Sequence, residues 1–347
     1  MTLLGNTIRA LCHVAWVWLL VMPLVSCNHK DLMVANYDVS AVHVTFDYSK
    51  VTDLPASMRT YFYPVLESGE VGQPQIYDLR PEGGVVYLAP GEYNIVAYNV
   101  DAENILEENA EVYNDFFLTT DKYEVEVTEE TNSPSHRVQY RKLFGSNVPF
   151  NDSEPTNYWL SDAPEWTISC RADHFQVLSF FNKASEEAQQ LSMLAEEATV
   201  TVSFELSGFE GLQLATLVRG TLSGVPAGHQ MATGAPIADS TMVSFLGYVD
   251  HEKNVITGTT RLWGYTPSGN HDTRQYLNIY IWAERGNYFL TEDITQQLNN
   301  GSQDGSPKLT VHLTSSINFF DGGEASGTSG FNPGVSDWKE EISSIQL

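Results

Sequence analysis

Cysteine is scarce in this chain of 347 residues, and the three cysteines have different settings. Cys12 lies inside an N-terminal apolar run, Cys27 follows that run, and Cys170 lies far downstream. Once the N-terminal segment is removed and Cys27 is modified, Cys170 has no partner for an intrachain disulfide. The fold must then be stabilised by an ordinary buried core. We expect Cys170 to pack as a small apolar residue.

Basic residues are also few, since 18 lysines and arginines stand against 44 aspartates and glutamates, for a net charge of −26. Nucleic-acid binding needs clustered Lys and Arg to displace the counterions of the phosphates, and the sequence has no such cluster. An anionic membrane surface would likewise be repelled. The sequence therefore predicts no nucleic-acid partner and requires any membrane attachment to come from a covalent lipid.

Recognisable catalytic motifs are absent from the sequence, which has no GxSxG, GxxxxGK[ST], GxGxxG or HExxH pattern. Its histidines are isolated, so we predict no enzyme activity, no cofactor and no metal site. Acidic pairs such as Glu107 with Glu108 are interpreted as solvated loop residues rather than a general acid and base. The acidic stretch 101–108 lacks the ligand spacing of a calcium loop. The segment 299–306 is read as a turn between two strands.

Long hydrophobic runs are limited to one, residues 10–22, which follow Arg9. The run is too short to span a bilayer comfortably, and a charged start with an apolar middle is typical of an export signal. Leu24, Val25 and Ser26 precede Cys27 as in a bacterial lipoprotein signal. We expect residues 1–26 to be removed and Cys27 to carry acyl chains such as palmitate. The remaining chain would then lie outside the inner membrane.

Alternating apolar and polar residues dominate the chain from residue 40 onward, which is the period of strands with one buried face. Alternation occurs in four segments: 42–46, 123–127, 200–206 and 309–313. Aromatic and β-branched runs lie at 60–63, 85–88, 93–98 and 277–282, with Gly-Gly, Pro-Gly and Ser-Gly turns among them. Short strands at this spacing predict an all-β protein built of β-sandwiches.

Two further features concern the organisation of the chain. The polar stretch 129–164 contains four prolines and loses the alternation, so we place a domain boundary near residue 150, with domains 27–150 and 151–347. The segment 183–198 has apolar residues at helical spacing, with Asn182 as N-cap, and is predicted to be one short accessory helix. No parallel βαβ alternation follows it, so no nucleotide-binding fold is expected.

Aromatic residues in the second half offer a possible ligand surface. Tyr280 and Trp282 alternate with an apolar set, Leu277, Ile279 and Ile281, and therefore lie on the opposite face of their strand. Together with Trp263 they either stack on sugar rings as a surface glycan-binding platform or pack under a covering loop. Packing is the simpler interpretation, and glycan binding is the alternative function.

Several short motifs resemble those of the Bacteroides fimbrillin-like lipoproteins, including minor-fimbrium anchoring subunits. In the first half these are 27–32 (CNHKDL), 44–48 (VTFDY), 61–64 (YFYP), 90–93 (PGEY) and 97–101 (AYNVD). In the second half they are 219–224 (RGTLSG), 290–295 (LTEDIT) and the closing segment 338–347. The resemblance implies two tandem transthyretin-like β-sandwich domains on the outer membrane, lipid-anchored and surface-exposed. It also implies a role in anchoring or assembling fimbriae (pili) for cell adhesion.

The resemblance further implies assembly with other fimbrial subunits by strand exchange, in which an extended segment of one subunit completes a sheet of the next. After a Gly/Ser-rich stretch, 321–334, the chain regains apolar residues that are either a donated strand or the last strand of their own domain: Val335, Trp338, Ile342, Ile345 and Leu347. In stalk subunits, cleavage after a basic residue removes the first strand. Lys50 and Arg59 are the corresponding candidates here, and both are equally compatible with ordinary loop or strand-edge roles.

Overall fold

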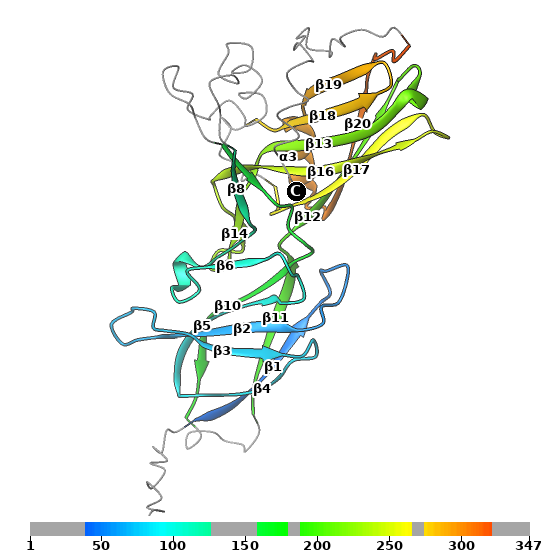
Figure 1. The fold of residues 1–347 in the computed structure, drawn as a ribbon. Coiled ribbons are helices and arrows are strands. Elements are labelled where there is room, and N and C mark those ends of the chain that lie inside the picture. The colour runs from blue at the N-terminus through cyan, green and yellow to red at the C-terminus, as the bar shows by residue number, and fades with distance from the viewer. Residues whose placement is uncertain (1–38, 126–157, 180–187, 266–273, 321–347) are drawn as a thin grey trace, which may run out of the picture.

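The computed structural model describes residues 39–125, 158–179, 188–265 and 274–320, and in this part the regular secondary structure is almost entirely β-strand. The strands form two large sheets and one small sheet, with the element labels of Figure 1. The predicted all-β class with sandwich-like domains is confirmed. The strands predicted at 42–46, 60–63, 85–88, 93–98, 200–206, 277–282 and 309–313 are all present, and that at 123–127 is present as far as Val125.

The first large sheet has seven strands around one core. Their order is β3 (Gln75–Leu79), β2 (Met58–Val65), β5 (Gly91–Asn99), β10 (Ile168–Val177), β11 (Gln189–Glu197), β1 (Ser40–Asp47) and β4 (Gly84–Leu88). The sheet curves so that side chains of β1, β4 and β11, such as Val44, Leu88 and Met193, share a core with those of β2, β5 and β10, such as Phe62 and Ile95. This is the first sandwich.

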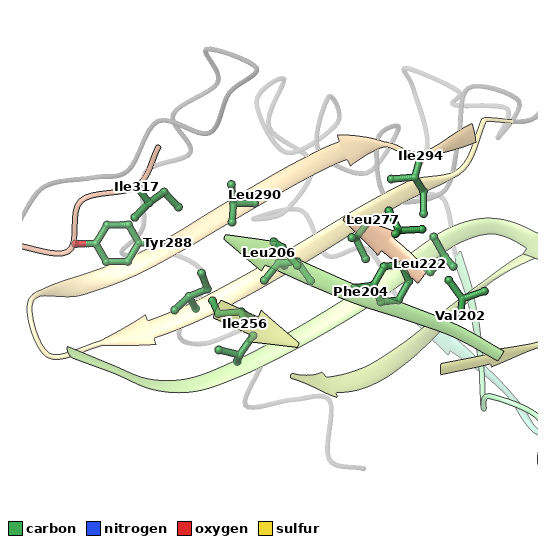
Figure 2. Close-up of a cluster of buried hydrophobic side chains, with 14 of the residues drawn as sticks. Val202, Phe204, Leu206, Leu222, Ile256, Leu277, Tyr288, Leu290, Ile294 and Ile317 are labelled. Carbon is green, nitrogen blue, oxygen red and sulfur yellow. The ribbon is translucent and has the colours of Figure 1, made fainter. Parts of the chain in front are cut away.

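The second large sheet has nine strands. Seven follow the order β19 (Gly286–Asp293), β18 (Tyr276–Ala283), β13 (Ala215–Pro226), β16 (Ser240–Asp250), β17 (Val255–Leu262), β12 (Val200–Ser207) and β20 (Lys308–Thr314). The antiparallel pair of β8 (Lys122–Val125) and β9 (Tyr158–Ser161) joins this sheet through a parallel pairing of β9 with β16. Figure 2 shows the core of this sandwich, where Phe204, Leu222 and Leu277 face one another from three strands.

A small sheet lies between the two large sheets (Figure 1). It contains β15 (Ala235–Pro236), β14 (Gly228–Gln230), β7 (Phe117–Thr119) and β6 (Leu106–Glu108). The β7–β14 pairing joins the two halves of the sequence, with His229 opposite Leu118. The sandwiches are therefore connected by backbone hydrogen bonds as well as by the chain itself.

The strands of the two sandwiches interleave along the sequence. The chain passes from the first sheet into the second at β8 and β9, returns for β10 and β11, and enters the second sheet again at β12. The predicted boundary near residue 150 lies outside the described residues. Within them, the last passage from the first large sheet to the second falls between Glu197 and Val200. A division into 27–150 and 151–347 would place β10 and β11 apart from the sheet to which they belong.

The predicted helix 183–198 is wrong where the structure describes it, because residues 189–197 form strand β11. The sequence here fits both periods, since Leu191 and Ala195 are spaced for a helix face while Leu191, Met193 and Ala195 also alternate. The strand buries these three residues and leaves Leu194 37% exposed. Pairing with β1 on one side and β10 on the other decides the conformation. Residues 183–187 lie outside the described part.

The one α-helix in the described residues is α3 (Thr295–Asp304), which replaces most of the turn predicted at 299–306. Asp293 Oδ1 accepts hydrogen bonds from the backbone N–H of Thr295 at 3.1 Å and from its hydroxyl at 2.6 Å, which supports the start of the helix. Leu298 is buried in the core, and Gly305 ends the helix in the left-handed region with φ 62°. Two 3-10 turns, η1 (Tyr113–Asp115) and η3 (Leu212–Leu214), complete the elements.

Candidate functional site

The first strand is the element nearest to Cys27 in the sequence, and it occupies an interior position of the first sheet. Strand β1 pairs in parallel with β11, with Val44 opposite Leu191, and antiparallel with β4, with Val42 opposite Val86. Val42 and Val44 have no exposed surface. Removing β1 would therefore break two hydrogen-bond ladders and expose a hydrophobic groove between β4 and β11.

Contacts at the start and in the middle of β1 hold it in place. Ser40 is fully buried and donates its hydroxyl to the carbonyl of Leu178 at 2.5 Å. In the middle of the strand, Gly83 approaches so closely that a Cβ built on it would lie 1.9 Å from the carbonyl oxygen of Val44. Gly83 has φ +96°, a conformation that disfavours any side chain. The turn between β3 and β4 therefore depends on glycine to close over β1.

The two candidate cleavage residues have different environments. Lys50 lies in a turn after β1 with its side chain 58% exposed and its Nζ 2.7 Å from Glu196. Arg59 lies within β2, whose backbone is paired with β3 on one side and β5 on the other. Proteases bind extended, unpaired backbone, so cleavage at Arg59 would require β2 to leave the sheet. Of the two positions, the fold presents only Lys50 in an accessible turn.

Arg59 also has a structural role that the sequence did not reveal. Its guanidinium donates to both carboxylate oxygens of Asp78, at 2.8 and 3.2 Å, and to Glu107 at 3.3 Å. The hydrogen bond to Asp78 is the main reason that the pKa of Arg59 is raised, and it lowers the pKa of Asp78. The interpretation of Arg59 as a strand residue is consistent with these contacts.

Glu107 is the centre of a polar cluster on the outer side of the first sheet. Tyr61 donates its phenolic hydrogen to Glu107 Oε1 at 2.6 Å, and Tyr98 donates to the same oxygen. Burial, followed by these hydrogen bonds to a carboxylate, raises the pKa of both tyrosines. Sequence analysis placed Glu107 in a solvated loop. The error has a physical cause, because the phenols that meet it come from β2 and β5, far away in the sequence.

An aromatic cluster joins the two sandwiches at this place. Its buried members come from the first sheet, the small sheet and the second half of the chain: Tyr61, Tyr63, Val96, Tyr98, Tyr113, Phe116, Leu118, Met231 and Trp263. The Tyr61 ring meets Phe116 edge-on at 4.9 Å, and Tyr63 meets Tyr113 at 5.3 Å. Such pairs add about 0.5–1.5 kcal/mol each beyond burial. The cluster therefore resists relative movement of the sandwiches.

His229 lies in the contact between the two sandwiches around this aromatic cluster, which is called the joint below, and it is fully buried. Its Nε2 lies 3.1 Å from the hydroxyl of Ser169 on β10, and its ring stacks near Trp263 with centroids 6.4 Å apart. Burial lowers the pKa of His229 to about 4. Its Nδ1 and the Nε1 of Trp263 have no hydrogen-bond partner within the described residues. A neutral histidine thus lies between β14 and the first sheet.

The three aromatic residues predicted as a glycan platform do not form one surface. Trp263 is only 2% exposed and belongs to the joint, so it cannot stack on a sugar in this structure, because both of its faces are covered. Tyr280 and Trp282 are half-buried on β18, on the face opposite Leu277, Ile279 and Ile281, which pack in the core as expected.

The predicted lipidation site and the candidate strand-exchange segment both lie outside the described residues. The lipidation site consists of Cys27 and the recognition residues Leu24, Val25 and Ser26. The strand-exchange segment is 335–347, with Val335, Trp338, Ile342, Ile345 and Leu347. In the described part, no helix is long and apolar enough to cross a membrane. The same residues contain no group of three or more His, Cys, Asp or Glu side chains that could hold a metal ion.

Cys170 behaves as expected from the sequence. It is a free cysteine, 2% exposed, in the core of the first sandwich. Burial raises the pKa of its thiol to about 12. The residue therefore packs as a small apolar side chain and carries no reactive thiolate.

A comparison with protein-family models decides the family. The model described as "Domain of unknown function (DUF5119)" matches residues 26–245. The chain belongs to the DUF5119 family. The match covers all of the first sandwich and continues into the second sheet as far as β16, so it includes every buried member of the aromatic cluster except Trp263.

Individual relatives of this DUF5119 protein carry fimbrial and adhesin names. Over 94 residues it is 34% identical to a candidate fimbrium anchoring subunit, Fim4B, of Bacteroides ovatus. The chain spans about a quarter of that relative, since the match covers 27% of each protein. The resemblance to the Bacteroides fimbrillin-like proteins is confirmed by this match and by the family model.

Solved structures show the same fold. A candidate adhesin from Bacteroides ovatus superposes with a TM-score of 0.56 at 20% identity, covering 79% of this chain and 89% of that one. The fimbrial anchor protein Mfa2 from Porphyromonas gingivalis gives 0.48 at 10% identity, with 80% and 91% covered.

Proposed function

We propose that this DUF5119 protein is a lipid-anchored, non-enzymatic fimbrial component that holds fimbriae at the outer membrane and pairs strands with other subunits. It acts at the cell surface. The proposal is supported by the lipoprotein signal ending at Cys27, the relative named as a fimbrium anchoring subunit, and the interior position of β1. The position of β1 is the observation that carries it.

The path from lipid to fold is short. Twelve residues separate Cys27 from Ser40, so even a fully extended linker reaches only about 45 Å. Because β1 is parallel to β11, and β11 leads directly to β12, the Ser40 end of β1 points away from the second sheet (Figure 1). A force that pulls the second sheet away from the membrane then acts along β1. It is borne at the same time by the hydrogen-bond ladders from β1 to β4 and to β11.

An anchor of this design must keep the chain intact after β1. If the turn at Lys50 were cut, the lipid would be joined to the rest of the protein only by non-covalent contacts of β1. Partner subunits are therefore expected to pair away from β1. The second sheet offers two terminal strands, β19 and β20, and the segment 335–347 is the candidate for donation to a neighbour.

The test is a deletion strain complemented with single variants. Loss of the gene is expected to release fimbriae into the medium or to change their length, and Cys27→Ser is expected to leave both the protein and the fimbriae unattached. Cys170→Ala is the matched control, because it removes the other cysteine of the exported chain without touching the lipid site. Unchanged fimbrial length, amount and retention in the deletion strain would contradict the anchoring role.

A second variant separates attachment from assembly. Truncation before Val335 is expected to leave the protein in the membrane fraction while fimbriae are lost or unattached. Membrane fractionation and electron microscopy measure the two outcomes. Normal fimbriae with the truncated chain would exclude residues 335–347 from strand exchange.

A further inference from the structure

We infer that the outer face of the second sheet, at the centre of β16, β13 and β18, is a binding surface for a neutral glycan. This surface consists of Leu217, Arg219, Leu246, Tyr248 and Trp282 and is called the outer-face patch below. It is separate from the strand edges and the lipid site. The inference does not depend on the proposed anchoring function.

Strand register places these residues on one face. Leu217 lies opposite Trp282 on β18, and Arg219 lies opposite Leu246 on β16. Val218 pairs with Gly247 and points into the core with 1% exposure, so its neighbour Leu217 points outward beside Tyr248. One row across the three strands is thus Tyr248, Leu217 and Trp282, and the next row is Leu246, Arg219 and the half-buried Tyr280.

The outer-face patch is more exposed than apolar sheet residues usually are. Tyr248 is 65% exposed, Leu246 50% and Leu217 43%, whereas Trp282 is half-buried. Isolated exposed apolar residues need no explanation, but adjacent ones on neighbouring strands form a patch. The sequence pattern identified Trp282 only, because the other members come from strands distant along the chain.

Arg219 supplies hydrogen-bond donors within this apolar surface. It is half-buried, and its Nε has no hydrogen-bond partner within the described residues. A guanidinium carries five N–H donors, and leaving a desolvated donor unpaired is unfavourable. Because the Nε is buried, a ligand with acceptor oxygens would bind to the terminal N–H groups of the guanidinium. Apolar side chains with a few polar donors are typical of small-ligand sites.

The size of the patch decides between a protein and a smaller ligand. In a row across three strands, the first and third side chains lie about 10 Å apart, and the two rows lie about 7 Å apart along the strands. A stable protein interface needs about 800 Å² on each partner, several times this area. A chain of sugar rings is narrow enough to lie along the row.

The charge and chemistry of the surface decide the class of glycan. The chain carries a net charge of −26, so a polyanionic polysaccharide or a nucleic acid would be repelled. A neutral sugar avoids this repulsion. Its C–H faces can stack on Tyr248 and Trp282, while its hydroxyl oxygens accept hydrogen bonds from Arg219.

The experiment is binding of the exported chain to an array of neutral and anionic glycans, followed by titration with the best neutral oligosaccharide. We expect binding to neutral glycans and none to polygalacturonate. Tyr248→Ala should weaken the affinity about tenfold, as for one lost stacking contact, and Arg219→Gln should weaken it as well. Tyr87→Ala is the matched control, because Tyr87 is 61% exposed on β4 of the other sheet.

Three results would overturn the inference. They are binding to no neutral glycan on the array, equal losses for Tyr248→Ala and Tyr87→Ala, and self-association of the chain that Tyr248→Ala abolishes in the absence of glycan binding. Thermal unfolding of each variant shows whether it is folded. Because Tyr248 is the most exposed member of the patch, its removal is expected to leave the fold intact.

Discussion

Gly83 lies directly against the carbonyl of Val44, so that the turn between β3 and β4 closes over the first strand at the point where any side chain would collide with it. This contact couples the terminal strands of the first sheet to the strand that follows the predicted lipid attachment site. The position of β1 therefore depends on backbone packing as well as on the burial of Val42 and Val44.

Replacing Gly83 with alanine should destabilise the protein more than replacing another glycine of similar conformation. Gly69 has φ +83° with nothing within 4 Å of the point where a Cβ would lie, so Gly69→Ala should cost only the conformational strain of about 1–2 kcal/mol. Gly83→Ala adds a collision with backbone 1.9 Å away. Urea denaturation of both variants measures the difference. Equal losses would show that the contact with Val44 relaxes freely.

The strand assignment of β11 is tested by adjacent lysine substitutions. Met193 is 1% exposed and Leu194 is 37% exposed. Met193→Lys should lower the free energy of unfolding by about 3 kcal/mol or more because it buries a charge, whereas Leu194→Lys should change it by less than about 1 kcal/mol. A helix with Leu191 and Leu194 on its buried face predicts a large loss at Leu194. Chemical denaturation distinguishes these outcomes.

Acidification should weaken the joint through His229. The pKa of the folded histidine is about 4, below its ordinary value of 6.5, so between these values the unfolded chain binds a proton that the folded chain does not. Stability from this group is complete above pH 6.5 and decreases as the pH falls toward 4, by roughly 3 kcal/mol for the full shift.

The measurement is the free energy of unfolding from pH 7 to pH 4 for the wild type and for His229→Gln. The wild type should lose stability more steeply than the variant over this range. His251→Gln, in an exposed turn, controls for removal of a histidine. Parallel curves for the wild type and His229→Gln would contradict a buried neutral His229.

Cys170 should be unreactive while the protein is folded. Its thiol is buried and its pKa is raised to about 12, so almost no thiolate is present at pH 8. In a chain starting after Cys27, a thiol reagent should label Cys170 only at the rate of unfolding. Labelling that is complete in native buffer but not accelerated by urea would show that the core around Cys170 is open.

Local sequence patterns were enough to predict most of the strands and their buried faces, and they contained no recognised catalytic motif. Local alternation is enough for this, since each residue of a half-buried strand reports its own face, as Val42, Val44, Ile279 and Ile281 do. The short motifs also indicated the fimbrillin-like family. The strands predicted from alternation were confirmed within the described residues, whereas the turn predicted at 299–306 proved to be mostly helix α3.

Tertiary structure decided what local pattern left ambiguous. Residues 189–197 fit both a helix and a strand, and only their two partner strands select the strand. Glu107 was interpreted as a solvated acid, and Trp263 was left as either a sugar-stacking or a packed ring. Only the fold shows that they meet Tyr61 and His229 from distant segments. The outer-face patch likewise needs three strands in register. Contacts between residues far apart in the chain follow from pairing order, which no single segment encodes.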